Sequence, residues 1–380
     1  MKRTILIFLT TCIVGSYLFA MPSIPGKTDN NNYKIYPSEN YGRNNPAFRD
    51  ELPQNILAIM VQFNDVTFDL DPDYPDSLAH NKEYFERLFF HLASFYSDAS
   101  HGNYILTEDN YTIWDNIITL SQPMGYYGEN DENGDLIERK CELVQETVQE
   151  IDDQLDFNDY DAIIIIHAGA GEEAASVDEN EDQLSSTFLS RRSLQAGLDP
   201  ENDDFPGIET NDDLYLTEFV IIPETEWQPN GVQGEDKIYN IFGVLAHQFG
   251  HQLGLPTLFD NNPDNGRSYG IGGFGVMGTG VWNANGFVPP LPCAWSRYYL
   301  GWEDENIVEI NSSFDNLSLV FPMAEDEDTP KLYKINISES EYFLIENRQQ
   351  NPDESVFINT DGDTLATFTF QTIPNQNVYP

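Results

Sequence analysis

Hydrophobic residues along the chain follow two spacings, and each spacing predicts a different kind of element. Residues 56–63 and 161–167 are short, mainly apolar runs rich in β-branched side chains, which predict buried strands. Residues 82–96 and 136–155 repeat apolar side chains every three or four positions, which predicts helices. This alternation of strands and helices predicts a layered domain of the α/β or α+β class with a mixed sheet.

The pattern changes twice further along the chain. Residues 172–214 are acidic and have no sustained apolar period, so we interpret them as a surface excursion. Strand patterning returns at 216–222 and is expected to end at Pro223, because proline cannot donate to a sheet. Beyond residue 310, short alternating runs predict a β-rich C-terminal segment; they lie at 317–321, 332–335, 342–345 and 367–370.

The first twenty residues have the layout of a secretory signal peptide. A positive start is followed by an apolar stretch at 5–19 and a small residue, Ala20. The stretch is shorter than the roughly 20 residues of a membrane-spanning helix, and lipid attachment through Cys12 is disfavoured because the apolar run continues beyond it. We therefore expect a secreted or cell-surface protein without a stable membrane span.

These patterns divide the chain into four parts. Residues 1–20 are the predicted signal peptide, and 21–51, rich in Pro, Asn and Gly, are an expected exposed leader or linker. Residues 52–310 form the predicted main domain, and 311–380 form the β-rich segment. Its abrupt end leaves open whether the protein continues beyond Pro380.

Charge excludes one class of partner. The 380 residues contain 64 Asp and Glu against 18 Lys and Arg, which gives a formal net charge of -46. Such a field repels nucleic acid and anionic membranes, so we expect no nucleic-acid partner. The acidity also suits solubility at high ionic strength or binding of divalent cations, and it does not determine the fold.

The two cysteines after the signal peptide allow two interpretations. Cys141 falls in an apolar series with helical spacing, which favours a buried thiol on a helix face. A disulfide with Cys293 is allowed in an oxidising compartment, but the sequence does not supply its geometry.

A histidine pair provides the main candidate chemistry. Residues 241–253 are a predicted helix, with Asn240 as a helix cap and Gly254 as a stop signal. His247 and His251 are four residues apart, a spacing that puts both imidazoles on one helix face, where they can bind one metal ion. By itself such a pair is also typical of ordinary core or surface histidines.

A glycine-rich turn strengthens the metal interpretation. Residues 270–278 contain several glycines and Met277, and they follow the histidines by about 20 residues. The combination resembles the long zinc-binding motif and Met-turn of metzincin-type peptidases. The same glycines fit Gly-x-Gly-x-x-Gly, but a dinucleotide site is disfavoured because no helix pattern follows them.

The chain resembles the immune-inhibitor-A family of secreted bacterial metallopeptidases over about residues 52–350. The stretches that carry the resemblance are 58–63, 95–97, 165–173, 245–256, 277–282, 294–302 and 342–348. The resemblance implies a metzincin-like catalytic domain, a zinc cofactor and a peptide or protein substrate. It also implies that His247 and His251 are zinc ligands, that Met277 forms the Met-turn and that Gly254 has a structural role.

Two positions depart from the family pattern. The family has a catalytic Glu between the histidines, and this chain has Gln248, whose amide cannot accept a proton at neutral pH. Losing such a general base costs about 10²–10⁴-fold in rate. The expected third ligand position is Thr257, a poor zinc ligand, which leaves the third ligand open between Asp260, Asp264 and a more distant carboxylate.

Three hypotheses remain at this stage. The first is a secreted metallopeptidase-family protein with weakened or lost catalysis. The second is an inactive pseudo-peptidase that binds peptides or proteins, and the third is a purely adhesive module, which does not explain the histidines and Met277 together. Calcium is an additional candidate ligand of the acidic turns at 131–135 and 361–363. His167, at the end of a predicted strand, either faces the site or is a bonded core histidine.

Overall fold

The computed structural model describes residues 6–10, 52–70, 79–131, 134–174, 183–226, 239–260, 268–304, 307–310, 332–338, 341–346, 355–360 and 363–369. Its contacts divide the chain into two compact units. One unit is Val14–Cys293, and the other combines Met1–Ile13 with Ala294–Pro380. This division falls earlier than the expected change at residue 310.

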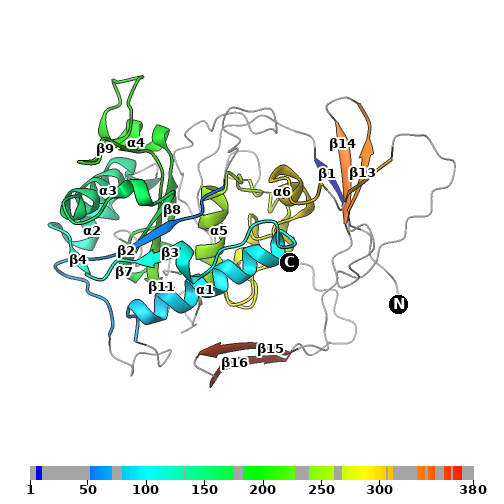
Figure 1. Cartoon of the computed structure of the whole chain (residues 1–380), viewed down its shortest axis with the longest axis horizontal. Helices are drawn as coiled ribbons and strands as arrows, with labels where there is room; N and C mark the ends of the chain where they lie inside the picture. Colours follow the sequence, from blue (N-terminus) through cyan, green and yellow to red (C-terminus); the bar gives the residue numbers. More distant parts are fainter. Residues whose placement is uncertain are drawn as a thin grey trace. The chain divides into compact units, whose positions relative to one another are not determined.

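The larger unit is built on a mixed sheet, as the alternating pattern predicts (Figure 1). The strand order is β3-β2-β7-β11-β8, and β4 also pairs with β2. The strands are β2 (Ile56–Gln62), β3 (Tyr111–Ile113), β4 (Ile118–Thr119), β7 (Ala162–Ala170), β8 (Thr187–Leu189) and β11 (Phe219–Thr225). All neighbours run parallel except β8, which lies antiparallel to β11.

Helices cover both faces of this sheet. They are α1 (Lys82–Ala99), α2 (Met124–Tyr127), α3 (Ile137–Ile151), α4 (Arg191–Leu198) and α5 (Phe242–Gln252). Helices α1 and α5 lie on one face, and α2, α3 and α4 lie on the other (Figure 1). Short strand pairs complete the unit: β5 (Asn130–Asp131) with β6 (Gly134–Asp135), and β9 (Ile208–Glu209) with β10 (Tyr215–Leu216).

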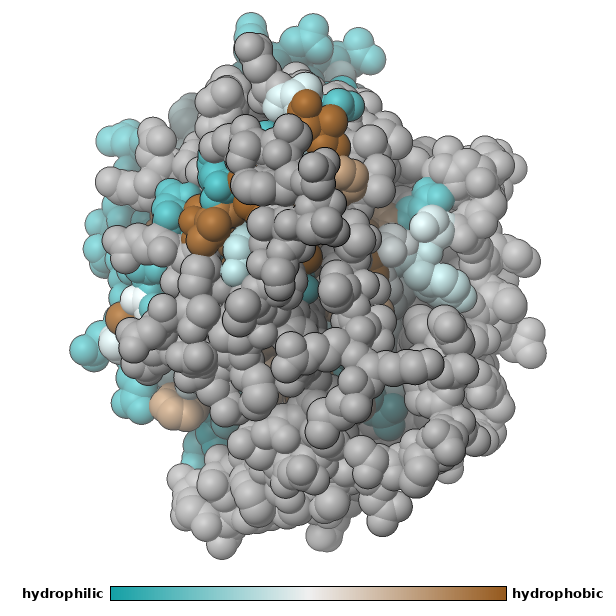
Figure 2. Space-filling view, turned by 90° about the vertical axis from the view of Figure 1, so that its right-hand side faces the viewer, coloured by the Kyte–Doolittle hydropathy of each residue, from teal (hydrophilic) through white to brown (hydrophobic). Residues whose placement is uncertain are grey.

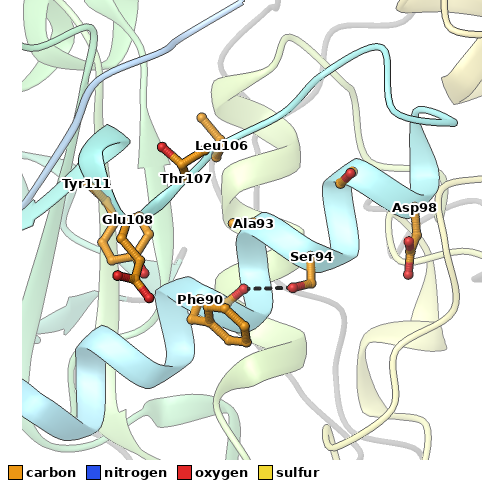
Figure 3. Close-up of a pocket in the computed structure, with 9 residues that line it drawn as sticks. Phe90, Ala93, Ser94, Asp98, Leu106, Thr107, Glu108 and Tyr111 are labelled. Carbon is orange, nitrogen blue, oxygen red and sulfur yellow. Dashed lines mark hydrogen bonds between the residues drawn. The ribbon is translucent and has the colours of Figure 1, made fainter.

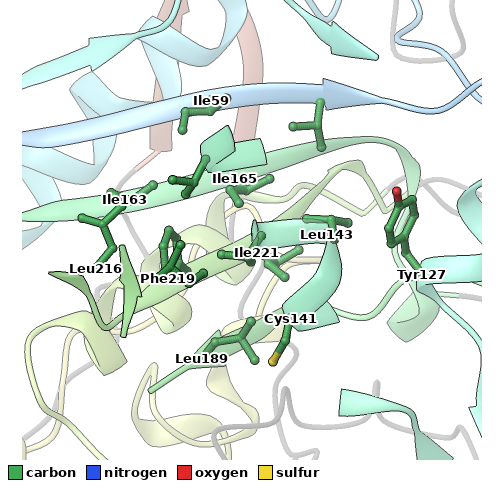
Figure 4. Packing of buried hydrophobic residues seen from close by; sticks show 14 of the residues in the cluster. Ile59, Tyr127, Cys141, Leu143, Ile163, Ile165, Leu189, Leu216, Phe219 and Ile221 are labelled. Carbon is green, nitrogen blue, oxygen red and sulfur yellow. The ribbon is translucent and has the colours of Figure 1, made fainter. Parts of the chain in front are cut away.

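Alternate side chains of the central strands form the core on the α3 face. Ile59, Ile165 and Ile221 pack there with Leu143 and Cys141 of α3 (Figure 4). The intervening strand residues are buried as well, on the face of α1 and α5, which explains why these strands are apolar at nearly every position. The predicted buried thiol is confirmed, since Cys141 is fully buried and makes no disulfide, and this burial raises its pKa to about 12.

The interpretation of 172–214 as a surface excursion is wrong. This stretch contributes the edge strand β8, the helix α4 and the strand β9. Leu184, Leu194 and Phe205 from it are buried in the core. Elements of three and eight residues are too short to show a period against an acidic background, which is why the sequence pattern did not reveal them.

The strand expected to end at Pro223 continues to Thr225. Proline is tolerated here because β8 pairs only with Phe219–Ile221. The missing amide hydrogen of Pro223 therefore removes no bond to β8.

The smaller unit contains a sheet in the order β1-β14-β13-β12. Its elements are β1 (Leu6–Thr10), α6 (Ala294–Tyr299), β12 (Ile307–Ile310), β13 (Leu332–Asn336) and β14 (Tyr342–Glu346), and a separate hairpin joins β15 (Ser355–Thr360) to β16 (Asp363–Thr369). Inside the unit, the buried Arg297 forms ion pairs with Glu303 and Glu346. Strands β13 to β16 fall within the predicted β-rich C-terminal segment, and the run at 317–321 lies outside the described residues.

Two features bear on the predicted ends and surface. Leu6–Thr10, within the predicted signal peptide, is paired with β14, and the expected leader at 21–51 lies outside the described residues. None of the described helices is both long and apolar enough to cross a membrane. On the face drawn in Figure 2, most of the coloured surface is hydrophilic and hydrophobic residues form small patches.

Candidate metal centre

Helix α5 ends in a turn that brings the chain back toward its second histidine. Gly254 has a φ of 90°, a left-handed conformation that favours glycine. The Leu255 N–H donates to the Gly250 carbonyl at 2.9 Å, and the Gly254 N–H donates to the His251 carbonyl at 2.8 Å. This pair of bonds is a Schellman motif, so the stop signal at Gly254 also fixes the position of the Leu255 carbonyl.

The two histidines of α5 face one another. Their Nε2 atoms are 3.2 Å apart. The Nδ1 atom of His247 lies 2.7 Å from the Val276 carbonyl oxygen, and the Nδ1 atom of His251 lies 2.7 Å from the Leu255 carbonyl oxygen. Because a carbonyl only accepts, each Nδ1 carries the hydrogen and each neutral ring directs its Nε2 lone pair into the shared space.

This arrangement fits a metal ion. Two nitrogens at the usual zinc bond length, with a tetrahedral angle between them, lie roughly 3.3 Å apart. The observed separation of 3.2 Å agrees with that value. Burial, and secondarily the nearby His247, lower the pKa of His251 well below its ordinary value, which keeps the ring in the neutral form that ligates metals.

Met277 and Tyr96 pack against helix α5 at Gly250. A side chain on Gly250 would collide with the Met277 sulfur and would come 3.2 Å from the Tyr96 hydroxyl. That hydroxyl donates to the Ala246 carbonyl at 2.6 Å. The glycine between the histidines therefore makes room for a thioether from the glycine-rich turn and a phenol from α1.

Gln248 is fully buried on the same helix. At 100° per residue, its direction about the helix axis differs by 100° from that of His247 and by 60° from that of His251. Gln248 therefore flanks the histidine pair. Neither its side-chain nitrogen nor its side-chain oxygen has a hydrogen-bond partner among the described residues. An amide left in this state is costly in a folded core, which is typical of a position that serves a ligand.

The candidates for a third ligand are less well grouped. Thr257 is buried, and the carboxylate of Asp260 accepts the Ser268 N–H at 3.3 Å. Within the described ranges, no three or more His, Cys, Asp or Glu residues form a group that could hold a metal ion. Asp264 lies outside the described residues, as do parts of the acidic turns considered for calcium.

The other buried histidines make their own contacts. His167 lies at 3.0 Å from the Ala168 carbonyl oxygen through Nδ1, and burial lowers its pKa to about 4. His80 pairs with Glu224 at 2.9 Å. The structure therefore groups His247 with His251 and leaves His167 as a core histidine.

Several groups that contact the two histidines or their helix were not predicted from the sequence. The Val276 and Leu255 carbonyls carry no side-chain signal, and Tyr96 appeared only within a stretch of family resemblance. Phe188 of β8 was also missed, and its ring centroid lies 6.0 Å from that of His251. Only the aromatic character of Tyr96 and Phe188 offered a hint.

A surface pocket lies elsewhere on the larger unit. It has a volume of 410 Å³ and is lined by side chains of α1 and of the segment 106–111 (Figure 3). Phe90, Ser94 and Asp98 line it from the helix, and Leu106 and Tyr111 line it from the segment. None of the predicted site residues contributes to it, so it is separate from the histidine pair.

Comparison with known proteins relates this geometry to a family. Residues 156–306 match the profile described as "Immune inhibitor A peptidase M6, catalytic domain", a segment that contains α5 and Met277. The chain is 21% identical over 372 residues to immune inhibitor A of Bacillus thuringiensis subsp. alesti, an alignment that covers 84% of this chain and 50% of that protein. The chain thus spans about half the length of this curated relative.

Solved structures of wild-type OgpA from Akkermansia muciniphila in two crystal forms are also similar. They are 15% and 16% identical to this chain, with TM-scores of 0.37 and 0.35. Both alignments cover 66% of this chain and 62% of the other.

The profile match supports a metallopeptidase-type function. It includes both histidines, the glycine-rich turn and the core strands β7 and β11. The resemblance inferred from the sequence is therefore confirmed, since both the matched segment and the aligned relative are of the immune inhibitor A type.

Proposed function

We propose that this protein is an exported, metal-binding member of the M6 peptidase type that binds peptide segments and has lost most of its ability to cleave them. The observation that carries the proposal is the buried Gln248 amide beside the facing Nε2 atoms of His247 and His251. Export is supported by the signal-peptide layout of residues 1–20.

The two histidines suit zinc as the resident metal. Their carbonyl-fixed tautomers and their 3.2 Å separation support tetrahedral ligation, and Asp260 or Asp264 is proposed as the third ligand. Zinc at this position would supply a Lewis acid that polarises a peptide carbonyl. The packing of Met277 against Gly250 of α5 supports the metzincin-like assignment.

Gln248 limits what the site can do with a bound peptide. Peptide hydrolysis needs a group that takes a proton from the attacking water and later delivers one to the leaving amine. A glutamine side chain can donate and accept hydrogen bonds, but it does not move a proton at neutral pH. We expect a rate about 10²–10⁴-fold below that of a variant with glutamate at this position.

The test combines zinc content with cleavage of an unstructured protein. The purified chain is expected to bind zinc but to cleave very slowly, and Gln248→Glu is expected to restore chelator-sensitive cleavage. His247→Ala in the Gln248→Glu background is the control and should abolish both zinc binding and cleavage. Rapid chelator-sensitive cleavage by the unmodified chain would contradict the loss of catalysis.

The third ligand is tested by separate substitutions. Asp260→Asn and Asp264→Asn are compared for zinc affinity, and the true ligand is the one whose loss weakens binding. Thr257→Asp is expected to strengthen binding at least tenfold, since it adds a carboxylate at the family's ligand position. Unchanged affinity in all three variants would exclude both carboxylates as ligands.

A further inference from the structure

We infer that the site at Gln248 selects ligands that carry a carboxylate, namely peptides with a free C-terminus, over peptides that present only internal amide bonds. The inference rests on the proposed metal site and names the class of ligand that this site takes. It follows from the net charge of the site and from the hydrogen-bonding capacity of the Gln248 amide.

The proposed metal site carries a net positive charge. The Val276 and Leu255 carbonyls place a hydrogen on each Nδ1, so rings that ligate the metal through Nε2 are neutral and do not offset the charge of a divalent ion. With one carboxylate as the proposed third ligand, the site would keep a single positive charge. A glutamate at position 248 would neutralise it, whereas Gln248 does not.

Burial makes this surplus charge matter. His247 and Gln248 are fully buried and His251 exposes 2% of its surface. A charge in such surroundings is poorly solvated by water and favours a partner of opposite sign. An anionic ligand supplies that partner, and a neutral peptide carbonyl does not.

The Gln248 side chain offers hydrogen-bond donors to an anionic ligand. Gln248 has two N–H donors, and its side-chain nitrogen has no hydrogen-bond partner among the described residues. A carboxylate oxygen can accept from this nitrogen in a charge-assisted bond, which is about twice as strong as a neutral one. Glutamate at this position would only accept, and two carboxylates side by side repel each other.

The same burial constrains how the ligand arrives. Because the three side chains are nearly inaccessible, a peptide reaches them only after the site opens. An association that requires a conformational change has a rate constant below the usual value of about 10⁵–10⁷ M⁻¹s⁻¹. Binding is therefore measured at equilibrium after long incubation.

The experiment uses the full chain loaded with Co²⁺, whose visible absorption reports ligand binding without any need for cleavage. Two probes are titrated, an N-acetylated tripeptide ending in leucine with a free carboxylate and the same tripeptide as its C-terminal amide. We expect the acid to bind at least tenfold more tightly than the amide. In Gln248→Glu, this preference should fall at least tenfold.

Two further variants separate charge from hydrogen bonding. Gln248→Leu removes the donors without adding a negative charge, so its preference should lie between those of the unmodified chain and Gln248→Glu. Gln62→Glu makes the same charge change at the end of β2, where the amide bonds Thr119, and should leave the preference unchanged.

The outcomes distinguish this inference from the proposed function. Equal binding of acid and amide, binding of neither probe, or a preference that survives both Gln248 substitutions overturns the inference and leaves metal binding intact. Failure of the unmodified chain to take up Co²⁺ overturns the proposed metal site itself. If Gln248→Glu does not fold, Gln248→Leu still decides the role of the amide.

Discussion

The sulfur of Met277 occupies the space that a side chain at Gly250 would need. Substitution of Gly250 by alanine must therefore displace the thioether or the helix. We expect Gly250→Ala to lower the free energy of unfolding by about 1–3 kcal/mol, the usual cost of overpacking a core. Urea unfolding followed by circular dichroism measures this change.

A double-mutant cycle shows whether Met277 is the cause. In a Met277→Ala background the collision is absent, so Gly250→Ala should cost less than it does in the unmodified chain by at least about 0.5 kcal/mol. Additive costs would mean that another neighbour, such as the Tyr96 hydroxyl, excludes the side chain at residue 250.

The Tyr96 hydroxyl is expected to hold helix α5 in place through its 2.6 Å bond to the Ala246 carbonyl. Tyr96→Phe should lower the free energy of unfolding by about 1–2 kcal/mol and also weaken zinc binding. Tyr104→Phe is the matched control, because Tyr104 is a buried tyrosine whose hydroxyl binds Pro53 instead. That variant should lose stability while keeping its zinc affinity, as measured by competition with a chelator.

Gly254 is expected to control metal affinity through the Leu255 carbonyl that orients His251. Gly254→Ala forces a side chain into a backbone conformation with φ of 90°, and the resulting shift should weaken zinc binding about tenfold. Gly102→Ala imposes the same kind of strain at φ of 76°, where nothing lies within 4 Å of the added carbon. Equal zinc affinity in the two variants would contradict the role of the Leu255 carbonyl.

The buried His167 is expected to lower the free energy of unfolding in acid. Its folded-state pKa of about 4 lies below the ordinary value of 6.5, because burial disfavours the charged ring. Between these two values the unfolded chain binds the proton more readily, so the contribution of His167 is complete above pH 6.5, declines as the pH falls and is lost below about pH 4.

The difference between the unmodified chain and His167→Gln isolates this effect. Each pKa unit corresponds to about 1.4 kcal/mol, so the stability of the unmodified chain relative to the variant should fall by up to about 3 kcal/mol between pH 7 and pH 4. His101→Asn is the control, since His101 is exposed and asparagine tolerates its positive φ of 55°. A pH-independent difference for His167→Gln would show that the folded-state pKa is not depressed.

Long elements were predictable because their patterns are local and repeated. Residues 82–96 and 136–155 show many turns of helical spacing, and both helices appear in the structure. The strands β8 and β9 were missed because three or two residues cannot display a period. Their position in the sheet is decided by pairing with distant strands.

The sequence by itself determined the family resemblance, the helix that carries His247 and His251, and the presence of Gln248 between them, since each depends on residue identity or on the fixed pitch of a helix. Only the tertiary structure decided which groups support the histidine pair. Val276 lies 29 residues from His247 in sequence, and Tyr96 lies 150 residues from Ala246. Contacts across such separations arise from the packing of α1, α5 and the glycine-rich turn, and no local spacing encodes them.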